Sequence, residues 1–147
     1  MRIDYTNGWY QGDVNSAGEY HGQGELHKGN ASYKGGFCNG QYDGYGELVA
    51  NDGSKYYGHF INGVLSGKGH YISANYEYQG DFSRGMPNGQ GTLKTSQFTY
   101  TGQVCEGNMH GYGEVNYTNG TTIRGYFANN KANGRCTYRC YDYEATG

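Results

Sequence analysis

The chain lacks long hydrophobic runs, and it contains little proline. Of its 147 residues, 35% are hydrophobic and only one is proline. Soluble domains are usually ~45–50% apolar, so a thick two-layer core is not expected. No segment approaches the ~18–20 apolar residues of a membrane-spanning helix. The single proline also excludes collagen, which needs much proline and a glycine at every third position.

The chain has no strong charge of either sign. It carries 11 basic and 13 acidic residues, a net charge of −2. Nucleic-acid-binding proteins normally present a basic face, and here the only gathered basic residues are Lys131, Arg135 and Arg139. Stable binding to anionic lipid usually needs a cluster of ~4–8 basic residues. We therefore expect no nucleic-acid partner, and only weak support for lipid.

Glycine and tyrosine are abundant, with 28 and 18 residues, and they recur at fixed positions. HGQGEL at 21–26 is nearly repeated by HGYGEV at 110–115. Between them, Gly-x-Gly pairs return every 22 or 23 residues. Such self-similarity is the signature of a repeat protein. The structural glycines of these pairs are Gly22, Gly24, Gly44, Gly46, Gly67, Gly69, Gly89, Gly91, Gly111 and Gly113.

A second motif precedes each pair: an aromatic residue, a spacer and a glycine. The stretches are YQG (10–12), YKG (33–35), YYG (56–58), YQG (78–80) and YTG (100–102), and a sixth copy reads IRG (123–125). Two residues after each of these glycines comes an apolar residue: Val14, Phe37, Phe60, Phe82, Val104 and Phe127.

The local period within each copy is two residues, which indicates strands. In Tyr33-Lys34-Gly35-Gly36-Phe37, the residues at i, i+2 and i+4 share one face of a strand. Asn-Gly and Asp-Gly pairs lie between the half-repeats and supply the positive φ that tight hairpin turns need. The sequence predicts an all-β fold: an elongated, twisted, single-layer antiparallel meander of repeated β-hairpins.

Glycines beside tyrosines leave a floor on which a ring can lie. A single-layer sheet can cover only part of its aromatic face, so we expect an aromatic-lined groove that binds a partner. The alternative is that the rings only pack against each other and hold the array straight. The predicted groove residues are Tyr33, Phe37, Tyr56, Phe60, Tyr78, Phe82 and Tyr100.

The pattern Tyr-x-Gly-x-aromatic-x-x-Gly-x-x-x-Gly-x-Gly resembles the MORN (membrane occupation and recognition nexus) repeat. The resemblance covers residues 8 to about 140. The sixth copy departs most, with Ile123, Asn130 and Cys136 in place of Tyr, Gly and Gly, and is expected to be a capping repeat. The predicted divisions are a closing strand of a partial repeat at 1–8, repeats at 9–30, 31–53, 54–75, 76–96, 97–120 and 121–141, and a tail at 142–147.

The N-terminal RIDYTNG (2–8) matches EVNYTNG (114–120), the closing strand of a repeat. An unpaired sheet edge is therefore expected at this end. Two explanations remain open. Either the chain is cut from a longer array, or Met1 is native and the edge is used for pairing.

No group of residues predicts catalysis or metal binding. His21 and His110 occupy a turn slot filled elsewhere by Asp43, Ser66 and Asn88, and metal sites need several converging ligands. A Gly-x-Gly dinucleotide fingerprint should open a helix, and none is expected here. Cys38 and Cys105 lie too far apart to bridge. We therefore expect no enzyme activity, no cofactor and no metal, with free thiols in a reducing, cytoplasmic compartment.

The resemblance implies a non-enzymatic scaffold or adaptor that binds protein partners. An amphipathic helix in the groove is one mode, and self-association is another. It further implies a cytoskeletal setting such as a cilium or flagellum, its axoneme or a basal complex. Two alternatives remain: a tether close to membranes that binds anionic phospholipids, and a regulatory repeat module of a larger enzyme.

Overall fold

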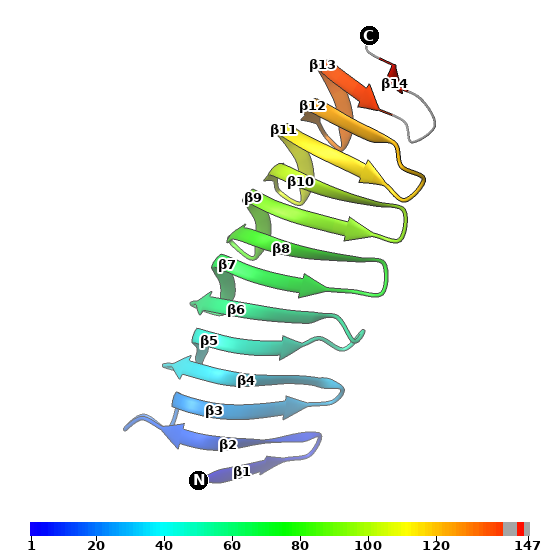
Figure 1. Cartoon of the computed structure of the whole chain (residues 1–147). Helices are drawn as coiled ribbons and strands as arrows, with labels where there is room; N and C mark the ends of the chain where they lie inside the picture. The colour runs from blue at the N-terminus through cyan, green and yellow to red at the C-terminus, as the bar shows by residue number, and fades with distance from the viewer. Residues whose placement is uncertain (140–143, 146–147) are drawn as a thin grey trace. The chain divides into compact units, whose positions relative to one another are not determined.

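The computed structural model describes residues 1–139 and 144–145, with side chains for residues 1–132. All regular structure in this part of the chain is β-strand. Within the same residues, no helix has the length and apolar character to cross a membrane. The chain divides into two compact units, residues 1–74 and 75–147, and each consists of successive hairpins (Figure 1).

The first unit is a single-layer antiparallel meander, in which each strand pairs with the next one along the chain. Its strands are β1 (Arg2–Tyr5), β2 (Gly8–Val14), β3 (Tyr20–Lys28), β4 (Ala31–Cys38), β5 (Gln41–Val49), β6 (Lys55–Ile61) and β7 (Val64–Ile72). Strand β1, from the predicted partial repeat, pairs with β2.

The second unit is built in the same way. Its strands are β8 (Tyr76–Ser83), β9 (Met86–Thr95), β10 (Phe98–Cys105), β11 (Asn108–Tyr117), β12 (Thr122–Ala128), β13 (Lys131–Arg139) and β14 (Glu144–Ala145). The predicted antiparallel meander of hairpins is confirmed in both units. Apart from β14, the predicted tail (142–147) lies outside the described residues.

Two-residue turns with positive φ join the two strands of most repeats. In the β4–β5 turn, Asn39 has φ 50° and Gly40 has φ 84°. Positive φ at both central residues defines the type I′ turn, whose twist matches that of the flanking strands. The sixth repeat keeps this turn without glycine, because Asn129 (φ 51°) and Asn130 (φ 70°) both adopt it, and asparagine tolerates the left-handed region better than most residues. The sixth hairpin is therefore regular at its turn.

Every repeat hairpin contains the same β-bulge. In the second repeat Gly35 pairs with Gly46, but Phe37 pairs with Tyr42, so one residue of β4 faces three of β5. The same shift follows the first motif glycine in the other five repeats. Bulges bend a strand and increase its local twist. The bend brings the tyrosine before the glycine over the strand that follows it.

The core consists of rings lying on glycines, as the sequence predicts. The Tyr33 hydroxyl donates a hydrogen bond to the Gly36 carbonyl at 2.9 Å, across the bend. A Cβ atom added at Gly46 would overlap the Tyr33 ring. Tyr78 repeats the arrangement, donating to the Asp81 carbonyl at 2.9 Å while its ring lies against Gly91. Gly46 and Gly91 are thus required because a tyrosine fills the space of each missing side chain.

Candidate binding groove

The predicted aromatic groove is mostly closed. Six of its seven residues are buried in the chain's own core, with at most 4% of their surface exposed: Tyr33, Phe37, Phe60, Tyr78, Phe82 and Tyr100. The prediction that these six line an open surface is wrong, because the rings fill the space between one another. Tyr56 alone is half-buried, and its ring lies 4.7 Å from that of Tyr71. A partner contact at Tyr56 stays a prediction.

The rings contact one another across successive repeats. Tyr33 meets Phe37 edge-on, with ring centroids 5.0 Å apart, and Phe60 of the next repeat at 5.4 Å. In the second unit Tyr100 meets Phe127 of the next repeat in the same geometry at 5.3 Å. These edge-to-face contacts are a favourable arrangement of aromatic pairs. They support the alternative interpretation, in which these contacting rings (the ring ladder) stabilise the array.

The residues that cover the tyrosines were not among those predicted from the sequence. Tyr42 stacks on Tyr33 with ring centroids 3.9 Å apart, and Tyr20 stacks on Tyr10 at the same distance. Leu65 and Met109 occupy equivalent register positions and are buried. The signal was present, since an apolar or aromatic residue follows each motif tyrosine after nine or ten positions. Tyr42 and Tyr20 were not predicted to be core residues because they precede the Gly-x-Gly pairs, in a stretch where turn residues were expected.

Burial changes the acidity of the core tyrosines. Loss of solvent raises the pKa of Tyr33 to about 12, with a further contribution from the nearby Tyr42. Burial likewise raises the pKa of Tyr78 to about 12, and the Asp81 carboxylate adds to the shift. Both phenols therefore stay protonated at neutral pH and serve as hydrogen-bond donors. These shifts follow from burial rather than from a catalytic arrangement.

A continuous row of glycines crosses the strands of each unit. In the first unit neighbouring strands pair glycine with glycine, in the order Gly12, Gly24, Gly35, Gly46, Gly58 and Gly69. In the second unit the row runs Gly80, Gly91, Gly102, Gly113 and Gly125. Their missing side chains would point toward the buried rings, as at Gly46 and Gly113. On the opposite face only the glycine backbone is present, and it forms the floor of an open groove.

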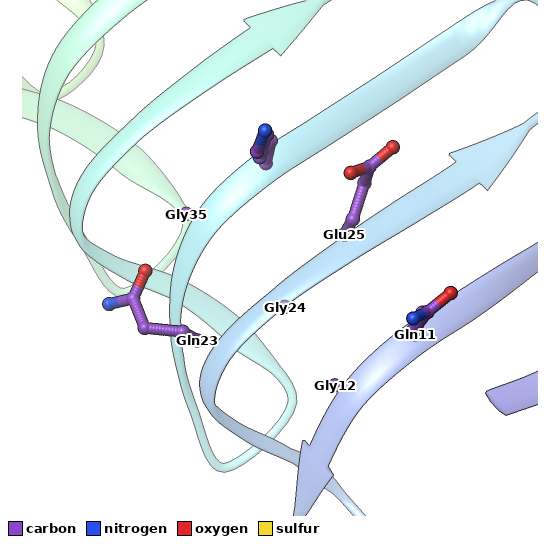
Figure 2. A pocket seen from close by; sticks show the side chains of 7 residues that line it. Gln11, Gly12, Gln23, Gly24, Glu25 and Gly35 are labelled. Atoms are coloured by element: carbon purple, nitrogen blue, oxygen red, sulfur yellow. The ribbon is translucent and has the colours of Figure 1, made fainter. Parts of the chain in front are cut away.

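In the first unit this groove has a volume of about 390 Å³. Gly12, Gly24 and Gly35 form its floor, and the side chains of Gln11 and Glu25 stand on one side of that floor. Gln23 stands on the other side (Figure 2). Because alternate residues of a strand point to opposite faces, these polar side chains face away from the buried tyrosines.

The same groove recurs in the second unit, with a volume of about 420 Å³. It is lined by Gln90, Thr101, Gly102, Gln103, Tyr112, Gly113 and Glu114. Each lining residue except Glu114 is either glycine or carries an amide, hydroxyl or phenol group. The recurrence at the corresponding slots of both units shows that the repeat itself builds the groove.

Each unit also carries an exposed aromatic pair across neighbouring strands, and in the second unit one member of the pair, Tyr112, lines the groove. Tyr112 and Tyr126 pair across β11 and β12, with centroids 5.4 Å apart at 75°, and are 50% and 55% exposed. Tyr45 and His59 make the equivalent pair in the first unit, also at 5.4 Å, and Tyr45 is 76% exposed. Exposed aromatic side chains are enriched where proteins bind partners. The exposed rings are therefore not those predicted from the sequence.

Hydrogen bonds hold the second groove in shape. The Gln103 side-chain oxygen accepts a hydrogen bond from the Tyr112 amide at 3.2 Å, which leaves the Gln103 NH₂ group as a donor. The Asp81 carboxylate accepts a hydrogen bond from the backbone N–H of Gln90 at 3.0 Å. Arg124 pairs with Glu114 at 2.9 Å. The negative charge of Glu114 is thus neutralised by the positive charge of Arg124.

The histidine slot was predicted to lie in a turn, which is wrong: His21 lies in strand β3, because the chain continues through the bulge as a strand. Its Nδ1 accepts a hydrogen bond from the backbone N–H of Asn39 at 3.3 Å, which is a structural role. Among the described residues, no three His, Cys, Asp or Glu side chains converge as a metal site would require. Cys38 and Cys105 are free thiols. Cys140 lies outside the described residues, and Cys136 is described for its backbone alone.

The family model described as MORN repeat matches residues 33–55, 56–77, 78–96, 100–122 and 124–144, well over half of the chain. The chain belongs to the MORN repeat family. The hairpin β2–β3, which precedes these ranges, has the same bulge and the same tyrosine–glycine contact as the matched MORN repeats. No curated protein matches the chain.

Proposed function

We propose that this MORN-repeat protein is a non-enzymatic scaffold that binds protein partners through its glycine-floored grooves. The observation that supports this most directly is the placement of the tyrosines. One set is buried and builds the array, whereas Tyr45, Tyr112 and Tyr126 are exposed, and Tyr112 lines the groove of the second unit. Large exposed rings held in place by neighbouring strands offer contact area at a low entropic cost.

The partner is expected to be a cytoskeletal protein of a cilium, a flagellum or a basal complex. This placement rests on the resemblance of the sequence to MORN scaffolds. The protein is expected to work in the cytoplasm, which fits the free thiols of Cys38 and Cys105. Self-association of the array remains a second way in which the same surfaces would be used.

Affinity capture with paired variants tests the proposal. The groove variant combines Tyr112→Ala with Tyr126→Ala, which removes the aromatic wall of the second unit. The control is Tyr117→Ala, on the same strand as Tyr112 but on the other face, with 37% of its surface exposed. Circular dichroism melting of each variant establishes that it is folded before capture is compared.

The expected result is that partners retained by the wild type and by Tyr117→Ala are lost by the groove variant. Capture that is unchanged in a folded groove variant would remove the groove as the contact site. Flotation with vesicles of anionic phospholipid at physiological salt tests the tether alternative. Co-flotation of the protein would favour the lipid function over the scaffold.

A further inference from the structure

The groove of the second unit has a spacing that few linear ligands match. It runs across the strands, and Gln90 and Tyr112 occupy the same slot in successive repeats on its wall. Equivalent wall positions are two strands apart, or ~9.6 Å at ~4.8 Å per strand. A ligand lying along the groove therefore meets an equivalent wall position every ~9.6 Å.

Among the regular conformations of a polypeptide, polyproline II fits this spacing. It has three residues per turn and rises ~3.1 Å per residue, or ~9.3 Å per turn. An α-helix repeats every ~5.4 Å, and an extended strand presents one face every ~6.7 Å. Residues i and i+3 of a polyproline II segment would thus face successive repeats of the groove.

The chemistry of the groove matches the same conformation. Polyproline II has no internal hydrogen bonds, so its carbonyl groups are free to accept. The wall offers donors at Thr101 and at Gln103, whose amide is oriented by its bond to Tyr112. Tyr112 and Tyr126 present rings against which prolines can pack. Aromatic-lined grooves with such donors are a recurring way to bind proline-rich segments.

The charge of the groove points to an uncharged ligand. Glu114 is neutralised by Arg124 at 2.9 Å, and the other side chains that line the groove are amides, a hydroxyl and a phenol. A polyanion or a polycation would find no complementary field. An amphipathic helix would need an apolar groove, whereas the apolar residues of this unit, such as Tyr100 and Val115, are buried on the other face.

We propose that the groove of the second unit binds a proline-rich segment of a partner protein in the polyproline II conformation, with one turn per repeat. This inference rests on the scaffold function proposed above, and it names the class of segment that the scaffold takes. The row from Gly80 to Gly125 spans roughly 19 Å at ~4.8 Å per strand. That length accommodates about six residues at ~3.1 Å each.

Fluorescence anisotropy with labelled peptides tests the proposal on the full chain. The probe is an oligoproline peptide of L-proline, about nine residues long to give three turns. The matched control is the same peptide made of D-proline, which has identical composition and the opposite helical hand. An amphipathic helical peptide and anionic vesicles complete the set. Tyr112→Ala and the control Tyr117→Ala are titrated alongside the wild type.

Saturable binding of the L-proline peptide is expected, with little binding of its D-proline mirror image. Tyr112→Ala should weaken binding about tenfold, the effect expected of a central aromatic contact. Tyr117→Ala should change it less than about twofold, as is usual for residues outside the contact. Equal binding of both peptides, or an unchanged affinity in folded Tyr112→Ala, would overturn the proposal. So would preference for the helical peptide or for vesicles.

The two proposals fail in distinguishable ways. If the oligoproline peptide does not bind while partner capture still depends on Tyr112 and Tyr126, the polyproline inference is wrong and the scaffold function stands. If capture is also independent of these residues in a folded variant, the groove has no binding role and both proposals fall.

Discussion

The hairpin bend is the same at Tyr33 in the first unit and at Tyr100 in the second, but the residues at the covering position differ. In the first unit Tyr42 stacks on Tyr33 at 3.9 Å, so the core there is ring upon ring. In the second unit Met109 takes the register position equivalent to that of Tyr42, opposite Val104. What both units share is the tyrosine, its hydrogen bond across the bend and the glycine under its ring. The tyrosine–glycine contact is thus the same at both positions, whereas the residue at the covering position differs.

Removing the core tyrosine should have the largest effect in either unit. Truncating a large buried ring to alanine typically costs ~3–5 kcal/mol of unfolding free energy. Tyr33→Ala should cost more than Tyr100→Ala, because it also loses stacking with Tyr42, and aromatic pairs contribute ~0.5–1.5 kcal/mol. Urea denaturation followed by circular dichroism measures both. Equal losses would show that Tyr42 adds nothing beyond what Met109 provides.

Filling the glycine floor should have the next largest effect, and it should be similar in both units. A Cβ atom at Gly46 would overlap the Tyr33 ring, and one at Gly113 would overlap the Tyr100 ring. Gly46→Ala and Gly113→Ala should each cost ~1–3 kcal/mol by overpacking.

The control for these glycine variants is Gly67→Ala, where no atom lies within 4 Å of the added Cβ but φ is +80°. It should cost ~1–2 kcal/mol from backbone strain alone, and its backbone and ring contacts should otherwise persist. Near-ultraviolet circular dichroism separates the two cases, since only the floor variants displace a tyrosine. An unperturbed aromatic signal in Gly113→Ala would contradict the assigned contact.

High pH should weaken both units. The ordinary tyrosine pKa is ~10, whereas burial raises the pKa to about 12 for Tyr33 and for Tyr78. Because the unfolded chain loses these protons first, the stability they contribute is complete below pH ~10 and is lost as pH rises towards ~12.

Thermal melts across that pH range measure the alkaline loss, and the variants Tyr33→Phe and Tyr78→Phe are its controls. Each variant should lose stability less steeply than the wild type as the pH rises. At neutral pH each should be less stable by roughly 0.5–1.5 kcal/mol, because it lacks the hydrogen bond across the bend. A decline of the same steepness in both variants would assign the alkaline loss to other groups.

Surface ion pairs should matter least. Arg124 pairs with Glu114 in the second unit, with 57% of the Arg124 side chain exposed. Exposed pairs usually contribute ~0–1 kcal/mol, so Arg124→Ala should lower stability by less than that. Arg2→Ala, which breaks the exposed pair with Asp4 in the first unit, is the matched variant. A loss well above this range would show that Arg124 supports the groove wall through packing.

The repeat length, the strands, the turns and the ring-on-glycine contact were all readable from the sequence. They depend on short-range chemistry: alternation of residues along a strand, positive φ at Asn-Gly, and a missing side chain on the strand next to a tyrosine. Even the sixth hairpin follows this logic, because Asn130 adopts the conformation that glycine has elsewhere. The bulge itself was not foreseen, although its glycines were found.

The choice between buried and exposed tyrosines was beyond the sequence. Tyr33 and Tyr45 are both strand residues beside a glycine, yet one is 1% and the other 76% exposed. The pattern assigned the rings to faces but could not show which face closes on itself. That is decided when the bulge bends the strand over its neighbour, since the bend covers one face with the next repeat's rings. It leaves the other as a groove above a row of glycines.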